Sequence, residues 1–146
     1  MEFITDRTQA DVDYVKEISA KLKAGTATAE ETEAWNAGLK GAYNYTDLNR
    51  VEAATAELAA ELCLTLNTKT DWTVEDVPTN SDMERYLANI RIIRNAVWEF
   101  ESTPPLPADM RRLNYVKANN IEKVISDLYA VIASIYRCNE LYCGEV

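Results

Sequence analysis

The stretch that decides the fold is residues 115–137, YVKANNIEKVISDLYAVIASIYR. Its apolar residues recur at intervals of three and four, which is the spacing of one face of an α-helix. This is the widest apolar face in the chain, so the segment is predicted to be the central helix of the core. Leu128 and Ile132 lie mid-face and are expected to be almost fully buried. The face consists of Ile121, Val124, Ile125, Leu128, Val131, Ile132 and Ile135.

Two helices are predicted in the first forty residues. The first runs from Thr8, which with Asp11 resembles a capping box, to about Lys23. The second is shorter and opens at Thr28, where Glu31 completes another capping box. Both boundaries rest on the pairing of an N-cap hydroxyl with an acidic side chain three residues later.

Two longer helices are predicted between these and the last one. The earlier begins near Thr46 or Asp47 and reaches about Leu66. The later is capped by Ser81, with Glu84 closing the capping box. A connector carrying a tryptophan and a proline separates the two helices.

The remaining segments complete the predicted architecture. Three prolines in residues 102–107, STPPLP, cannot continue a helix and predict a rigid extended linker. Residues 139–146 are expected to be a frayed end or a stub of strand. Both long connectors are unusual for a helical bundle. Long ordered loops often carry a function, and the alternative is that these two only span the end of the bundle. The chain is therefore predicted to be one all-α domain over residues 1–146, a four-helix-bundle-like fold with one additional short helix.

The charge balance limits the classes of partner. The formal net charge is −9 and the isoelectric point is about 4.5. Recognition of nucleic acid or of an anionic membrane surface needs clustered Lys and Arg, so both are disfavoured. A basic protein partner remains open, and the alternative is that the acidity only keeps the protein soluble. No signal peptide is expected at the N-terminus, and the three cysteines predict free thiols in a reducing cytoplasm.

No catalytic or metal-binding motif is found. The chain has no histidine, which excludes Ser-His-Asp and Cys-His catalysis and His-bearing metal sites. Glu57 and Glu61 would share a helix face, but a solvated acidic face explains them better than acid–base chemistry. Cys63, Cys138 and Cys143 lack a fourth ligand for zinc. The protein is predicted not to be an enzyme and to need no cofactor.

The aromatic residues near two connectors are the best candidates for a binding site. Tyr43 and Tyr45 precede the third helix, close to Asp47, and Trp72 lies in the connector outside any helical stripe. Tyr and Trp are enriched among interface anchors. These four residues are therefore predicted to bind a protein partner, unless the aromatic side chains pack inward and lock the loops onto the core.

Four blocks of sequence carry a resemblance to a known group of proteins. The blocks are residues 4–12, ITDRTQADV; 38–52, GLKGAYNYTDLNRVE; 82–87, DMERYL; and 119–123, NNIEK. They resemble a helical domain that recurs in phage and prophage proteins of Firmicutes, often encoded with tail, baseplate or fibre genes. The blocks are spread over most of the chain, and none is a catalytic motif.

The resemblance implies a structural or assembly module associated with the phage virion or tail. Its partners would be other phage structural proteins, with a homo-oligomer possible, and its location the virion or the cytoplasm of the bacterial host. The alternative is a small acidic phage-encoded effector that inhibits a basic host protein. An effector of that kind should gather carboxylates on one surface, whereas a building block should present apolar or aromatic patches.

Overall fold

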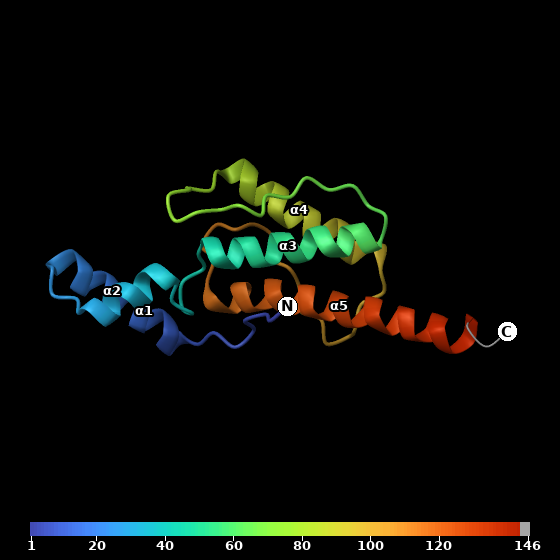
Figure 1. Ribbon diagram of the computed structural model, residues 1–146, viewed down its shortest axis with the longest axis horizontal. Coiled ribbons are helices and arrows are strands. Elements are labelled where there is room, and N and C mark those ends of the chain that lie inside the picture. The colour runs from blue at the N-terminus through green and yellow to red at the C-terminus, as the bar shows by residue number, and fades with distance from the viewer. Residues whose placement is uncertain (144–146) are drawn as a thin grey trace.

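The chain folds into α-helices joined by irregular segments (Figure 1). The structure is a computed structural model that describes the backbone of residues 1–143 and the side chains of residues 1–137. Within that part of the chain there are five helices and no strand, which confirms the predicted all-α, bundle-like fold. The helices are α1 (Gln9–Ala24), α2 (Ala29–Ala37), α3 (Tyr45–Glu61), α4 (Asn80–Ala96) and α5 (Tyr115–Cys143).

Helices α3, α4 and α5 form the packed body, and α1 and α2 form a hairpin at one end of it (Figure 1). α3 and α5 run in the same direction, as their side-chain contacts show: residues early in α3 contact residues early in α5, and residues late in α3 contact residues late in α5. Arg50 near the start of α3 contacts Glu122, and Glu61 at its end contacts Tyr136. α4 begins at the same end of the body as α3 and crosses it obliquely (Figure 1).

This direction explains why two connectors are so long. After α3 and again after α4, the chain must return to the end of the body where both helices began (Figure 1). α3 has 17 residues and is therefore about 25 Å long. Connectors over 62–79 and 97–114 have ample length for that distance, since an extended chain covers roughly 3.3 Å per residue.

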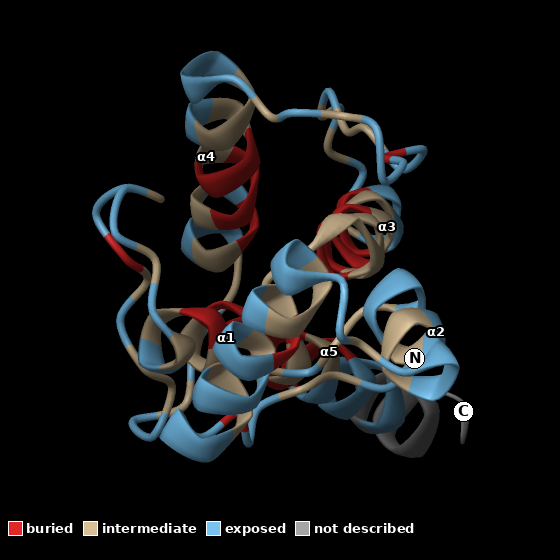
Figure 2. Ribbon diagram, turned by 90° about the vertical axis from the view of Figure 1, so that its left-hand side faces the viewer, coloured by how far each residue is buried: buried red, intermediate tan, exposed pale blue. Residues whose placement is uncertain are grey.

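The core lies between the facing sides of α3, α4 and α5, where the buried residues gather (Figure 2). Leu128 and Ile132 are 1% and 7% exposed, as the apolar face of α5 predicts. The most deeply buried apolar side chains of this core are Val51, Ala54, Leu58, Tyr86, Ile90, Ile93, Ile121, Val124 and Ile125.

The predicted capping boxes of α1 and α2 are confirmed, but that of α4 lies two residues earlier than predicted. Thr79, not Ser81, is the N-cap, and Asp82, not Glu84, is its partner. The Thr79 hydroxyl accepts from the backbone N–H of Asp82 at 3.2 Å, and the Asp82 carboxylate accepts from the N–H of Thr79 at 2.9 Å. Thr79 has extended backbone, which suits an N-cap, and Ser81 is left inside the first turn.

α3 is shorter than predicted, ending at Glu61 rather than at Leu66. Leu62, Leu64 and Leu66 alternate with exposed residues and pack against the core, which is the pattern of extended chain. The three leucines were compatible with helical continuation in sequence. Cys63, with φ +54°, marks the departure from the helix.

α5 is longer than predicted and includes residues 139–143, which are neither frayed nor a stub of strand. No proline or glycine interrupts the sequence before Gly144, so nothing local stops the helix. Residues 144–146 lie outside the described part. None of the described helices combines the length and apolar character needed to cross a bilayer.

The α1–α2 hairpin is held against the segment that leads into α3. Gly41 lies on the first turn of α1, and a Cβ atom there would be 2.1 Å from the carbonyl oxygen of Asp11. Only glycine permits such a close approach of two backbones. Residues 38–44 therefore pass directly from α2 across the start of α1 to α3.

Candidate protein-contact groove

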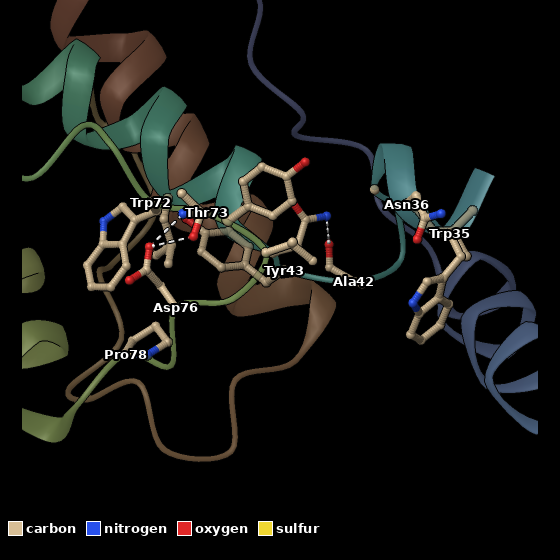
Figure 3. A pocket seen from close by; sticks show the side chains of 14 residues that line it. Trp35, Asn36, Ala42, Tyr43, Trp72, Thr73, Asp76 and Pro78 are labelled. Carbon is tan, nitrogen blue, oxygen red and sulfur yellow. Dashed lines mark hydrogen bonds between the residues drawn. The ribbon is translucent and has the colours of Figure 1, made fainter. Parts of the chain in front are cut away.

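A surface groove of about 290 Å³ lies where α2, the segment 38–44, the start of α3 and the connector after α3 meet (Figure 3). Three of the four residues predicted to bind a partner line it, namely Tyr43, Tyr45 and Trp72. Tyr43 and Tyr45 are neighbours in sequence and Trp72 lies in a separate segment, and the fold brings the three together at one groove. We call this feature the aromatic groove; it is lined by Trp35, Asn36, Gly38, Leu39, Ala42, Tyr43, Asn44, Tyr45, Leu48, Trp72, Thr73, Val74, Asp76 and Pro78.

Trp72 is fixed at one end of the groove. Its backbone is held by the carboxamide of Asn49, which donates to the Trp72 carbonyl and accepts from the Trp72 N–H, both at 2.8 Å. The side chain is 4% exposed and belongs to the core, and the Lys69 ammonium lies 4.0 Å from the ring centroid. Trp72 therefore locks its connector onto the body, and only part of its surface serves the groove.

Tyr43 is held by interactions on two sides. The Arg7 guanidinium lies 5.4 Å from the centre of its ring, within the range of a cation–π interaction. Its hydroxyl shares a hydrogen bond with the hydroxyl of Tyr86 on α4. Burial raises the pKa of Tyr43 well above its usual range, so the phenol stays neutral. Tyr43 is thus a fixed, uncharged part of the groove wall.

Trp35 and Tyr45 supply the more accessible aromatic surface. Tyr45 is the first residue of α3 and is partly buried, whereas Trp35 on α2 is 39% exposed. Trp35 was not predicted as a binding residue. Its signal was nevertheless present in the sequence: the short helix AEETEAWNA has no apolar face that a tryptophan could extend, and the structure buries none of its residues.

Asp47 requires a correction, because it does not face the groove. Its side chain is buried, and one carboxylate oxygen accepts from Arg7 at 2.7 Å and also from Arg50. The other oxygen accepts from the backbone N–H of Asn44 at 2.9 Å, which caps α3. This carboxylate is fully committed to internal contacts, so Asp47 is not available to a partner.

Asp47 belongs to a buried cluster of two positive and two negative side chains. Glu122 accepts from Arg7 at 2.6 Å and from Arg50 at 2.9 and 2.8 Å, and also from the backbone N–H of Ile4 at 2.8 Å. The charges balance, which a buried cluster requires. We call Arg7, Asp47, Arg50 and Glu122 the ion cluster; it ties the N-terminal segment and α3 to α5, and its Arg7 lies against the ring of Tyr43 in the groove wall.

The other candidate groups also have structural roles. The hydroxyl of Tyr129 donates to Glu57 at 2.6 Å, and that of Tyr136 donates to Glu61, so both carboxylates tie α3 to α5. Among the residues that the structure describes, no group of His, Cys, Asp and Glu could hold a metal ion. Cys63 is exposed, and the side chains of the two later cysteines lie beyond the described ones.

The chain matches no protein-family model, no curated protein and no solved structure. The resemblance to phage proteins therefore stays a prediction.

Proposed function

We propose that this protein is a structural or assembly module of a phage particle, associated with the virion or tail, that acts by contacting another protein. The aromatic groove carries the contact role, since Trp35, Tyr43, Tyr45 and Trp72 converge there from separate segments. Tyr and Trp dominate the energetic centres of protein interfaces. The phage setting rests on the sequence resemblance alone.

The chemistry of the groove supports recognition better than catalysis. Its volume of about 290 Å³ is at the lower limit for small-molecule sites, roughly 300–1,000 Å³. Asp76 is the one carboxylate that lines it, and it accepts from the N–H and hydroxyl of Thr73 at 2.7 and 3.0 Å. Acid–base catalysis needs two titratable groups with separated pKa values. A groove with a single engaged carboxylate offers a surface for side chains instead.

Preorganisation also supports a contact role. The core fixes Trp72, and Arg7 and Tyr86 fix Tyr43, before any partner arrives. Rigid aromatic surfaces lose little conformational entropy on binding, so more of their contact energy appears as affinity. Trp35 and Tyr45 then add more accessible aromatic surface beside the fixed side chains of Tyr43 and Trp72.

A second candidate function is the small acidic effector that inhibits a basic host protein. It is favoured by exposed carboxylates on α2 and on the connector beside the groove, including Glu30, Glu33, Asp71 and Glu75. Genomic position separates the two functions: tail-gene neighbours favour the particle module, and an isolated early-gene setting favours the effector.

The direct test is mass spectrometry of purified particles from the strain that encodes the chain. The proposal predicts the protein in the particles or in assembly intermediates, at a fixed ratio to tail proteins. Trp35→Ala should reduce this ratio because it removes the most accessible aromatic of the groove. Trp98→Ala is the matched control, since Trp98 is 70% exposed and does not line the groove.

Stability must be measured beside incorporation. Trp72→Ala should lower the melting temperature because Trp72 is part of the core. Trp35→Ala and Trp98→Ala should leave it nearly unchanged. Absence of the protein from particles and intermediates would contradict the proposal. Equal incorporation of Trp35→Ala and Trp98→Ala would show that the groove does not make the contact.

A further inference from the structure

Two of the segments that form the aromatic groove are acidic and contain no basic residue. α2 carries Glu30, Glu31 and Glu33, and the stretch 71–84 carries five carboxylates without a lysine or arginine. Both segments contribute to the groove lining. The groove is therefore formed in part by two segments that carry negative charge in the sequence.

Part of this charge is already used within the protein. Lys21 pairs with Glu31 at 2.6 Å, and Lys69 pairs with Asp76 at 3.4 Å. The nearby Lys40 pairs with Asp6 at 2.9 Å. These three lysines are thus already paired with carboxylates of the protein.

The remaining carboxylates make no ion pair with any described side chain. They are Glu30, Glu33, Asp71, Glu75, Asp82 and Glu84; Asp82 caps α4, and the other five are exposed. Because these carboxylates are not neutralised within the protein, they can attract a positively charged partner. Such attraction speeds association and orients the partner on the surface.

We propose that the aromatic groove binds a basic linear segment of a different protein, with one large apolar side chain in the groove and flanking Lys or Arg beside Glu33 and Glu75. This inference rests on the proposed contact function and specifies the partner's chemistry. The groove volume suits one or two side chains rather than a folded surface. The apolar anchor supplies affinity, and the flanking charges supply selectivity.

A second copy of this chain is a poorer occupant. Each copy carries a net charge of −9, so two copies repel at long range. In the most basic stretch of the chain, residues 110–117, Arg111 and Arg112 are exposed, but Met110 and Leu113 pack against the core, so this stretch cannot leave the fold to enter a groove as a linear segment. The two acidic segments therefore point to a partner of opposite charge.

The test is a selection of random twelve-residue peptides displayed on the surface of a filamentous phage, with the full chain immobilised. Counter-selection uses Trp35→Ala. Enriched sequences should share one aromatic or long aliphatic residue flanked by at least two Lys or Arg. The consensus peptide, synthesised with a fluorescent label, is then titrated with the protein by fluorescence polarisation.

Matched variants separate charge from anchor. Glu33→Gln with Glu75→Gln should weaken binding of the consensus peptide about 1.5- to 5-fold per charge removed. Glu2→Gln with Glu101→Gln removes the same charge from exposed positions outside the groove lining and outside both acidic segments, and should have no effect. Trp35→Ala should weaken binding about tenfold or more.

Three results would overturn the inference. They are enrichment of peptides without net positive charge, equal enrichment on Trp35→Ala, and no enrichment at all. Self-association of the protein that is lost on Arg111→Gln with Arg112→Gln would also overturn it in favour of a second copy. Each of these leaves the proposed function standing if Trp35→Ala still loses incorporation into particles, so the two failures are distinguishable.

Discussion

Glu122→Gln should be among the most destabilising single substitutions in this protein. Glu122 is 0% exposed and accepts four hydrogen bonds, three of them from Arg7 and Arg50. A glutamine offers only one oxygen, and its amide group would face a donor. The substitution also removes the charge that balances the two arginines.

The magnitude follows from the burial of the ion cluster. Removing one partner from a buried ion pair costs about 3–5 kcal/mol, because the remaining charge stays buried without compensation. A domain of this size is stable by roughly 5–15 kcal/mol in total. Glu122→Gln should therefore remove a large fraction of the free energy of unfolding without changing the helical fold.

Urea denaturation followed by circular dichroism measures this loss. With an m-value of about 2 kcal/mol/M, the midpoint should fall by roughly 1.5–2.5 M. Glu101→Gln is the control: this exposed residue makes no ion pair within the described part, and its loss should change stability by less than about 0.5 kcal/mol.

A double-mutant cycle checks that the ion cluster is the cause. Arg7→Met combined with Glu122→Gln leaves Arg50 and Asp47 as a balanced pair, so the double variant should lose less stability than the two single variants added together. The expected coupling is about 0.5–3 kcal/mol. A loss below about 1 kcal/mol for Glu122→Gln, or strict additivity, would refute the reasoning.

Three further predictions follow from the fold. Gly41→Ala should lower stability and speed hydrogen exchange in α1, because its Cβ would collide with the Asp11 carbonyl; unchanged exchange would contradict this close approach. Leu128→Ala and Ile132→Ala should each lower the free energy of unfolding by about 2–5 kcal/mol in urea denaturation. Losses under about 1 kcal/mol at both positions would show that the core lies elsewhere. Hydrogen bonds from the N-cap threonines lower the pKa values of Asp11 and Asp82, so their stabilisation is present above the unfolded value of about 3.9 and is lost as pH falls through the folded pKa. The melting-temperature difference between wild type and Asp82→Asn should accordingly shrink between pH 7 and pH 2, and a constant difference would argue against it.

The sequence predicts the helices well where local signals are unambiguous. The periodicity of α5 and the capping boxes of α1 and α2 need no distant contact to be recognised. Two competing signals precede α4, Thr79 with Asp82 and Ser81 with Glu84, and local chemistry does not choose between them. The end of α3 depends on tertiary packing, because the leucines after Glu61 fit either a helix or an extended segment.

The sequence did not predict a groove, but aromatic residues outside helical stripes stand out as binding candidates, and their binding role stays a prediction. Tyr43, Tyr45 and Trp72 were found in this way, and Trp35 could have been found by the same reasoning. The role of Asp47 could not, because its partner Arg7 lies 40 positions away. An acidic residue at a helix start looks the same in sequence whether it faces solvent or a buried arginine.

The most direct test of the contact surface is a quantitative pull-down of the partner from lysate of the particle-producing strain. Wild type is compared with Trp35→Ala and Ile92→Ser, after checking that both variants melt at the same temperature as wild type. Ile92 is an exposed apolar residue of α4, outside the groove lining. The account predicts that Trp35→Ala loses most of the bound partner and that Ile92→Ser retains it. Retention by Trp35→Ala with loss by Ile92→Ser would place the contact on a helix face and contradict the account.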